Sequence, residues 1–247
     1  MLDLPAGITT CLFDLDGVLT QTAKVHARAW KEMFDDFLRD WYGRRGEPFR
    51  EFDRPTDYDE YVDGKPRLDG VRSFLGSRGI DLPMGSPSDP RDAETVHALG
   101  TRKNDLVLEL IRRDGVDPYE GSVRFVQAAR DQGLRRAVVS SSTNCRDVLA
   151  AAGIDGLFEV VVDGVVAERE GLAGKPAADT FLAAARALGA EPAACAVFED
   201  AQAGVEAGRA GAFGWVVGVD RTGQADALRR KGADVVVSDL EELLERP

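Results

Sequence analysis

The chain has 247 residues, of which 44% are hydrophobic, 7% aromatic and 30% charged, and this composition excludes a disordered chain or a collagen-like repeat. The 43 acidic residues outnumber the 31 basic ones and give a net charge of −12, which argues against a nucleic-acid-binding face and against attraction to anionic lipid. No apolar run approaches the roughly 20 residues of a membrane span, and the first residues lack the pattern of a secretory signal. We therefore expect a cytoplasmic protein that has neither nucleic acid nor membrane as a partner.

Six short apolar runs predict buried strands, at 10–15, 136–140, 159–163, 194–198, 214–219 and 234–237. Helical segments separate the last five strands, at Thr143–Ala152, Pro176–Leu188, Ala201–Ala210 and Gln224–Lys231. A glycine follows each of these segments, which is a common signal at the end of a helix. Strands that alternate with short helices indicate an α/β fold, with a Rossmann-like parallel sheet covered by helices on both faces.

The long segment between the first two strands has a different character. It contains three predicted helices, at Val25–Tyr42, Leu68–Arg78 and Asp92–Arg113, joined by a polar excursion over 43–66 and a loop over 83–90. In the first helix the large apolar side chains recur at helical spacing, which predicts a core face: Trp30, Met33, Phe34, Phe37 and Trp41. We therefore predict a core domain of residues 1–21 and 119–247, and a helical domain of residues 22–118 inserted after the first strand.

Chemically active residues follow the predicted strands. Asp14 and Asp16 follow the first strand, Ser140–Asn144 the second and Glu199-Asp200 the fourth, while Lys175 precedes a helix. Taken singly, each has a plain interpretation: the Asp-x-Asp-Gly run as a turn or helix cap, the serines as a helix cap, and Glu199-Asp200 and Lys175 as solvated surface charge. Because ligands of a parallel sheet lie beyond the carboxyl ends of its strands, the whole set is expected to converge there.

The combined set suits phosphoryl transfer. A carboxylate can accept a phosphoryl group, a second carboxylate can move a proton, and oxygen ligands suit Mg²⁺, which would offset the repulsion between carboxylate and phosphate. Ser140 and Lys175 could hold the nonbridging phosphate oxygens. The motifs of mononucleotide-binding loops, dinucleotide-binding folds, serine hydrolases and EF-hands do not occur.

At these positions the sequence resembles the haloacid dehalogenase superfamily of phosphotransferases. The residues that carry the resemblance are the run Phe13–Thr20, Ser140, Lys175 and Glu199-Asp200, which match the four motifs of that family in order. The resemblance implies that Asp14 is the nucleophile and Asp16 the general acid/base, and that Asp14, Asp16 through its carbonyl, Glu199 and Asp200 hold Mg²⁺. Ser140, Ser141 and Lys175 would bind the phosphate. In this family a helical cap is inserted after the first motif.

Further runs resemble the β-phosphoglucomutase family within that superfamily: Asp16–Trp30, Arg102–Asp105, Ser142-x-Asn144, Gly174–Ala177 and Glu199–Gly204. This resemblance implies substrate contacts by two groups of residues, namely Thr22, His26, Gly64, Arg67 and Lys103 in or beside the cap, and Ser142 and Asn144 in the core. Thr22 and His26 would lie at the cap hinge near Asp16, and Arg67 would hold the second phosphate of the sugar. For His26 a role as a satisfied core or helix-capping histidine is the alternative.

Three features depart from the family pattern. Asp63 and Thr143 stand where lysines are expected, and the 43–63 excursion is longer than in compact members.

The resemblance implies the interconversion of β-D-glucose 1-phosphate and glucose 6-phosphate through an aspartyl phosphate and glucose 1,6-bisphosphate. A sugar-phosphate phosphatase is the alternative, and a catalytically silent binding protein is disfavoured because the acids are intact. The expected partner is a small-molecule sugar phosphate, and the expected state is a monomer.

Overall fold

The computed structural model describes residues 2–53 and 56–244. The chain divides into two compact units: unit 1, formed by residues 1–22 and 116–247, and unit 2, formed by residues 23–115. These divisions lie close to those predicted from the sequence. Arg54 and Pro55 of the predicted excursion, and residues 1 and 245–247 of the predicted core domain, lie outside the described residues.

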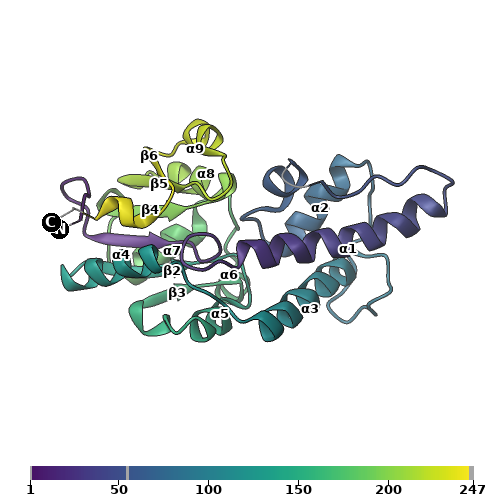
Figure 1. Cartoon of the computed structure of the whole chain (residues 1–247), viewed down its shortest axis with the longest axis horizontal. Coiled ribbons are helices and arrows are strands. Elements are labelled where there is room, and N and C mark those ends of the chain that lie inside the picture. The colour runs from purple at the N-terminus through teal and green to yellow at the C-terminus, as the bar shows by residue number, and fades with distance from the viewer. Residues whose placement is uncertain (1, 54–55, 245–247) are drawn as a thin grey trace. The chain divides into compact units, whose positions relative to one another are not determined.

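Unit 1 is built on a six-stranded parallel sheet, as predicted (Figure 1). Its strands are β1 (Thr10–Phe13), β2 (Arg135–Val139), β3 (Val160–Val162), β4 (Cys195–Glu199), β5 (Trp215–Val219) and β6 (Val235–Val237). They lie in the order β3-β2-β1-β4-β5-β6, and each neighbouring pair is parallel. From β1 the chain first adds strands on one side, β2 and β3, and then on the other side, β4 to β6. Parallel sheets bind ligands at the point where this direction changes, which here lies between β1 and β4. The α/β fold class with a Rossmann-like sheet is confirmed.

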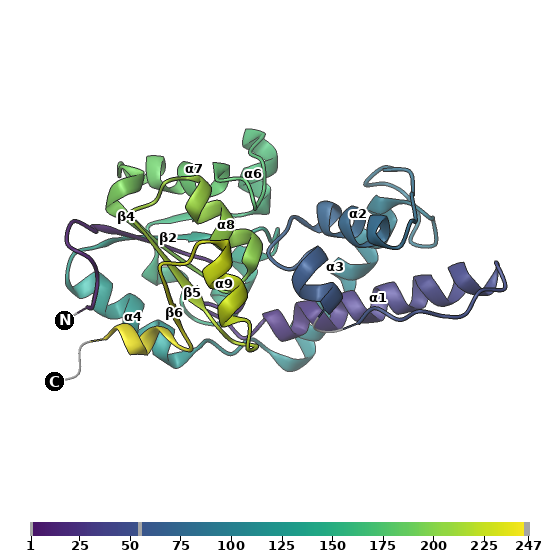
Figure 2. The ribbon, with the colours of Figure 1, turned by 90° about the horizontal axis from the view of Figure 1, so that it is seen from above.

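Helices cover both faces of this sheet (Figure 2). They are α4 (Glu120–Asp131), α5 (Cys145–Ala151), α6 (Gly164–Glu170), α7 (Asp179–Ala187), α8 (Gln202–Ala210) and α9 (Ala225–Lys231). On one face Leu12, Val139 and Val197 pack in a buried cluster with Phe181 of α7. On the other face Phe125 of α4 packs edge-on against Phe13 and Phe198. The strands are apolar on both sides because both faces are covered.

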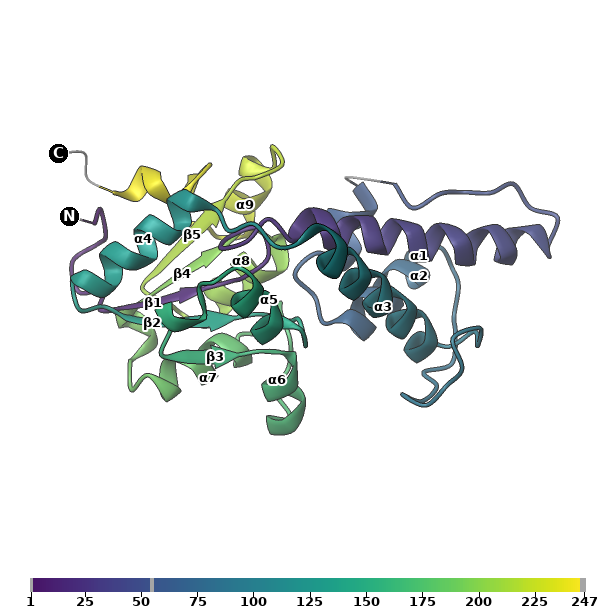
Figure 3. The same ribbon diagram turned by 60° about the horizontal axis from the view of Figure 1, so that its bottom comes forward.

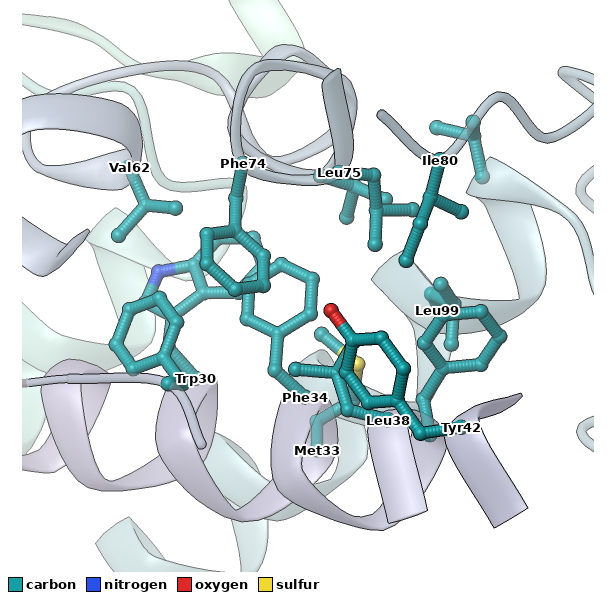
Figure 4. Close-up of a cluster of buried hydrophobic side chains, with 14 residues drawn as sticks. Trp30, Met33, Phe34, Leu38, Tyr42, Val62, Phe74, Leu75, Ile80 and Leu99 are labelled. Atoms are coloured by element: carbon teal, nitrogen blue, oxygen red, sulfur yellow. The ribbon is translucent and has the colours of Figure 1, made fainter. Parts of the chain in front are cut away.

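Unit 2 is helical and holds an aromatic core of its own (Figure 4). Its elements are α1 (Ala23–Gly43), a π-helical turn (Tyr58–Val62), α2 (Arg67–Ser77) and α3 (Val96–Asp114). Trp30 and Phe34 of α1 stack with ring centroids 5.2 Å apart, and Phe34 lies 4.3 Å from Phe74 of α2. Four residues of the predicted stripe are buried and Trp41 packs against them partly buried, so the predicted core face of this helix is confirmed.

The polar excursion of unit 2 contributes to that core, which its composition did not predict. Phe52 is fully buried and stacks on Phe34 with centroids 5.3 Å apart. Its amide donates to Asp35 Oδ1 over 2.7 Å, and farther along Asp57 pairs with Arg78 over 2.6 Å. One aromatic anchor and two buried carboxylates therefore hold an otherwise polar segment in place.

Several helices differ from the sequence prediction. Two were missed altogether, α4 and α6, because each carries few large apolar residues among many polar or small ones. Helix α3 begins at Val96 instead of Asp92, since the Thr95 hydroxyl caps it by accepting from the Ala98 amide. Helix α7 begins at Asp179 instead of Pro176, because residues 174–178 form the turn that carries Lys175.

The two ends of the described chain meet in unit 1, where Leu2 and Leu244 form an antiparallel bridge (Figure 3). Among the described residues, no helix combines the length and the apolar character that crossing a membrane requires.

Candidate active site

The acids and hydroxyls singled out in the sequence come together where β1, β2 and β4 end. Phe13, the last residue of β1, is in register with Val138 of β2 and with Phe198 of β4. The Asp14 amide continues this ladder by donating to the Phe198 carbonyl over 2.9 Å. Strand pairing therefore brings Asp14, Ser140 and Glu199 to one edge of the sheet, and all three are buried.

Lys175 reaches this edge from the turn before α7. Its ammonium is 2.5 Å from Asp14 Oδ1, 2.6 Å from Glu199 Oε1 and 3.0 Å from the Val139 carbonyl oxygen, to which it donates. The residue is only 2% exposed, and its pKa is raised despite burial because the two carboxylates favour the ammonium. Lys175 is thus a fixed positive charge beside Asp14 and not a surface lysine.

Three acids form a group that suits a divalent cation. Oxygen atoms of Asp14, Glu199 and Asp200 all lie within 4.8 Å of one another, and the three residues are buried. Burial raises the pKa of Asp14 and of Glu199, and the charge of Lys175 opposes that rise. Three buried carboxylates beside one ammonium carry excess negative charge, and hard oxygen donors are the ligands of Mg²⁺. The donor set therefore fits that ion.

Two glycines make room for these carboxylates. Gly17 has a φ of +92°, and a Cβ atom there would overlap the Asp200 carboxylate. A Cβ atom at Gly204 of α8 would overlap the Glu199 carboxylate in the same way. Sterics therefore explain why glycine ends the Asp-x-Asp-Gly motif and why glycine stands in the run after Asp200: a side chain at either position would collide with a carboxylate of the site.

Asp16 lies two residues beyond Asp14 and is held by Thr22. The Thr22 hydroxyl donates to Asp16 Oδ1, and the hydroxyl oxygens of Thr20 and Thr22 are 2.7 Å apart. Thr20 and Thr22 are buried, whereas Asp16 is partly exposed. Thr22 was predicted as a substrate contact, and in the structure it orients the carboxylate expected to move the proton.

The serine-rich run after β2 forms a compact turn. Ser140 Oγ accepts from the Ser142 amide over 3.1 Å, and Ser142 Oγ accepts from the Asn144 amide over 3.1 Å. These contacts order the turn before α5 but do not cap the helix, because its N-cap residue is Asn144 and no side chain caps its first turn, so the alternative interpretation of the serines as a helix cap is wrong. A serine hydroxyl that accepts one bond keeps its own hydrogen for donation, so the turn presents donors beside Asp14. Ser141 and Asn144 are partly exposed within it.

The remaining predicted residues, His26, Gly64, Arg67 and Lys103, belong to unit 2. Three of them form a second group together with Asn104, here called the cationic cluster: His26, Arg67, Lys103 and Asn104. Lys103 Nζ lies 2.9 Å from His26 Nδ1, and Arg67 Nη1 donates to Asn104 Oδ1 over 2.6 Å. Burial and the charges of Lys103 and Arg67 lower the pKa of His26 well below its usual range. His26 is therefore neutral and accepts from Lys103 at Nδ1, which favours a role in positioning Lys103.

Gly64 lies in the turn between the π-helical turn and α2, with a φ of +68°. This left-handed conformation favours glycine. Arg67 is the first residue of α2, so the turn at Gly64 sets where that helix and its arginine begin.

Three further residues contact the predicted site, although they were not predicted to belong to it. Asn104 accepts from Arg67, Gln224 donates to the Asp200 carbonyl over 3.1 Å, and Arg221 donates to the Gly17 carbonyl over 2.9 Å. The last two follow β5, whose carboxyl end lies at the same edge of the sheet. Ligands of a parallel sheet lie beyond the carboxyl ends of its strands, and applying this rule to the loop after β5 could have identified Gln224 and Arg221.

Removing one carboxylate of the acidic group tests its affinity for metal. We expect Asp200→Asn to weaken Mg²⁺ binding measured by calorimetry and to raise the Mg²⁺ concentration for half-maximal activity, because one anionic ligand is lost. Asp226→Asn, an exposed acid of α9, serves as the control and should leave both values unchanged. Equal Mg²⁺ affinity in the wild type and Asp200→Asn would exclude Asp200 as a ligand.

Comparison with known proteins places this site in a family. A sequence model of haloacid dehalogenase-like hydrolases matches residues 8–211. A β-phosphoglucomutase of Mycobacterium tuberculosis is 58% identical over 247 residues, covering 99% of this chain and 94% of that protein. A β-phosphoglucomutase of Bacillus subtilis is 30% identical, covering 94% of this chain and 90% of that protein. The crystal structure of a β-phosphoglucomutase from Clostridium difficile shares the fold, with a TM-score of 0.73, 24% identity and coverage of 96% and 93%. The chain therefore belongs to the haloacid dehalogenase-like hydrolase family.

Proposed function

We propose that the chain is a Mg²⁺-dependent β-phosphoglucomutase, which interconverts β-D-glucose 1-phosphate and glucose 6-phosphate. The observation that carries this proposal is the presence of two separate groups suited to phosphate, the acidic group with Lys175 in unit 1 and the cationic cluster in unit 2. A mutase must hold a sugar that carries phosphate at both ends, whereas a phosphatase needs one phosphate site. The name of the relative at 58% identity supports the same activity.

In the first step Asp14 attacks phosphorus. One carboxylate oxygen forms the new bond to phosphorus, the bond to the sugar oxygen breaks, and the product is an aspartyl phosphate on Asp14. Lys175 favours the ionised form of Asp14 and offsets charge on the transferred group. When bound, a Mg²⁺ ion held by Asp14, Glu199 and Asp200 would shield carboxylate and phosphate from each other's charge.

Asp16 carries the proton in both directions. It protonates the sugar oxygen as that oxygen leaves phosphorus, and it removes the proton of the sugar hydroxyl that later attacks the aspartyl phosphate. Its bond from Thr22 fixes the carboxylate for this role. A sugar that gains phosphate at its second position becomes the bisphosphate, which must bind again in the opposite orientation before its other phosphate is transferred.

The cationic cluster would hold the phosphate that is not reacting. The charges of Arg67 and Lys103 both lower the pKa of His26, and the two residues contact His26 and Asn104 of the same cluster. A phosphate dianion would be attracted to both cations, and the planar guanidinium of Arg67 can bind it through two donors. The family pattern has lysines at the positions of Asp63 and Thr143. In this chain Arg67 would supply the positive charge for the second phosphate in their place.

A sugar-phosphate phosphatase is the second candidate, and the observation that favours it is the match to a family of hydrolases. In that reaction water replaces the sugar hydroxyl as the group that attacks the aspartyl phosphate. The chemistry at Asp14, Asp16 and Lys175 is the same in both, so the two candidates differ in the acceptor and in the need for the cationic cluster.

Arg67→Ala distinguishes the candidates within the protein itself. We expect the mutase rate to fall roughly tenfold to a hundredfold, because a lost charge-assisted hydrogen bond is worth about 1.5–3 kcal/mol. Slow hydrolysis of the aspartyl phosphate should persist. Arg72→Ala, an exposed arginine on the same helix, is the control and should keep the mutase rate. An Arg67→Ala enzyme with unchanged mutase rate would remove the argument for a second phosphate site.

The proposed function is tested by identifying the product. The enzyme is incubated with β-glucose 1-phosphate, Mg²⁺ and a catalytic amount of glucose 1,6-bisphosphate, while glucose 6-phosphate and inorganic phosphate are measured in parallel. We expect glucose 6-phosphate to form in large excess over inorganic phosphate. Free glucose and inorganic phosphate as the main products would establish the phosphatase instead.

A further inference from the structure

Arg221 follows β5, and its guanidinium contacts three other parts of unit 1. Nε donates to the Gly17 carbonyl over 2.9 Å, and Nη1 donates to the Ser238 carbonyl over 2.6 Å and to Asp239 Oδ2 over 2.9 Å. The group also lies 3.6 Å from the centre of the Tyr119 ring. The side chain is only 13% exposed, so these contacts hold it in one place.

The first of these contacts acts on the loop that carries Asp16. Gly17 follows Asp16 directly, and its conformation brings the backbone against the Asp200 carboxylate. Ser122 holds the next carbonyl, because its buried hydroxyl donates to the Val18 oxygen over 2.7 Å. Arg221 and Ser122 therefore fix two successive carbonyls immediately beyond Asp16.

The same side chain anchors the segment that returns from the inserted helices. The Tyr119 amide donates to the Leu19 carbonyl over 2.9 Å, and Thr20 forms a bridge with Pro118. The Asp239 side chain lies so close to Gly121 that a Cβ atom there would overlap it. Helix α4 thus packs on the last helical turn, Leu240–Leu243, whose cap is Asp239 (Figure 3).

We infer that Arg221 is a positioning residue for phosphoryl transfer, which holds the Asp16–Leu19 loop at the geometry that the reaction needs. The inference rests on the proposed function in that it takes Asp14 and Asp16 as the reacting residues. It applies to mutase and phosphatase alike, because both use the same first step. Arg221 touches no reacting atom, so it acts through the carbonyl of Gly17.

A lysine could not replace this arginine. Two nitrogens of one planar fork reach the three acceptors, Nε on the side of Gly17 and Nη1 on the side of Ser238 and Asp239, and the guanidinium carbon lies over the Tyr119 ring. An ammonium keeps the charge but is a compact group that cannot reproduce the fork. Arg221→Lys therefore keeps the positive charge and removes the planar geometry, so its effect reports the role of the geometry alone.

The experiment compares Arg221→Lys with Arg136→Lys. Arg136 is a matched control because it is similarly buried, donates to the Leu157 and Leu134 carbonyls and pairs with Glu159, yet it lies at the start of β2, away from Asp14. Hydrolysis of p-nitrophenyl phosphate measures the chemistry at Asp14 without a sugar. Hydrogen exchange of the peptide covering residues 14–21 measures the loop without any activity.

We expect Arg221→Lys to lower kcat roughly tenfold to a hundredfold with little change in KM, since a small displacement of a reacting group has such effects. Exchange over residues 14–21 should rise in this variant. Arg136→Lys should lose thermal stability while kcat and loop exchange stay at wild-type values. Ser122→Ala should reproduce part of the Arg221→Lys effect, and the double variant should lose less than the product of the two losses.

Equal kcat and equal loop exchange in Arg221→Lys and Arg136→Lys would overturn the inference. A rise in KM alone would also overturn it, because that result assigns Arg221 to substrate binding. A wild-type protein that neither isomerises β-glucose 1-phosphate nor hydrolyses a phosphate ester would contradict the proposed function, and the exchange measurement would then still decide whether Arg221 holds the loop.

Discussion

Asp14→Asn is expected to lower turnover of β-glucose 1-phosphate by at least about 10⁴-fold, which is the scale seen when a catalytic nucleophile is removed. An amide has nearly the shape of the carboxylate but cannot form the covalent bond to phosphorus. Lys175 would keep its contacts with Glu199 and the Val139 carbonyl, so the variant should remain folded. Steady-state kinetics with freshly purified protein measure the loss, and circular dichroism checks the fold.

Asp163→Asn is the matched control for this variant. Asp163 is another buried acid of unit 1, but it caps α6 by accepting from the Val166 amide over 2.9 Å and pairs with Arg146. Its loss should lower the melting temperature and leave kcat unchanged. Comparable activity in Asp14→Asn and Asp163→Asn would rule out a covalent intermediate on Asp14.

Asp16→Asn is expected to lower kcat for sugar phosphates by about 10²- to 10⁴-fold, because a general acid/base contributes that much. The size of the loss should depend on the leaving group. A sugar oxygen needs a proton as it departs, whereas the anion released from acetyl phosphate does not. Phosphorylation of Asp14 by acetyl phosphate should therefore be much less affected than reaction with β-glucose 1-phosphate.

This dependence on the leaving group is the readout that a structural defect would not produce. Thr22→Val, which removes the hydrogen bond to Asp16, should give a smaller loss with the same dependence. Equal losses for both phosphoryl donors in Asp16→Asn would show that Asp16 does not supply the proton.

The sheet could be predicted from the sequence because its strands are apolar on both faces. Each of the six predicted runs overlaps a strand of the structure to within one residue at its ends or contains it, including short strands such as Val160–Val162 and Val235–Val237. Helix α4 could not be predicted in this way, since its large apolar residues are only Val123, Phe125 and Val126 among polar and small ones. The starts of α3 and α7 depend on one hydroxyl cap and on a turn that serves the site, which apolar periodicity does not report.

The unit 1 part of the candidate site was predictable for a related reason. Strand order places the residues after β1, β2 and β4 side by side, so sequence position alone indicates which polar groups meet. The contacts of Lys175 with Asp14 and Glu199 agree with that expectation. The contacts of His26 with Lys103 and of Arg221 with Gly17 join residues far apart in the sequence, and they depend on how helices and loops pack.

The part of the polar excursion that precedes the π-helical turn illustrates the same limit. Its composition is polar, and only the packed structure shows that Phe52 completes the aromatic core with Phe34 and Phe74. The segment leads into the π-helical turn and then to Gly64 and Arg67. Its anchoring therefore fixes where the predicted phosphate-binding turn begins, a consequence that composition does not reveal.

The most direct test of the account follows one labelled phosphoryl group. The enzyme is mixed with an equimolar amount of glucose 1,6-bisphosphate labelled with ³²P, quenched in acid, and digested to locate the label. A second sample is chased with unlabelled β-glucose 1-phosphate before the quench. The account predicts acid-stable, hydroxylamine-sensitive label on Asp14 in the first sample and its transfer to sugar phosphate in the second. Label that never appears on Asp14, or that leaves it only as inorganic phosphate, would contradict the proposed mutase.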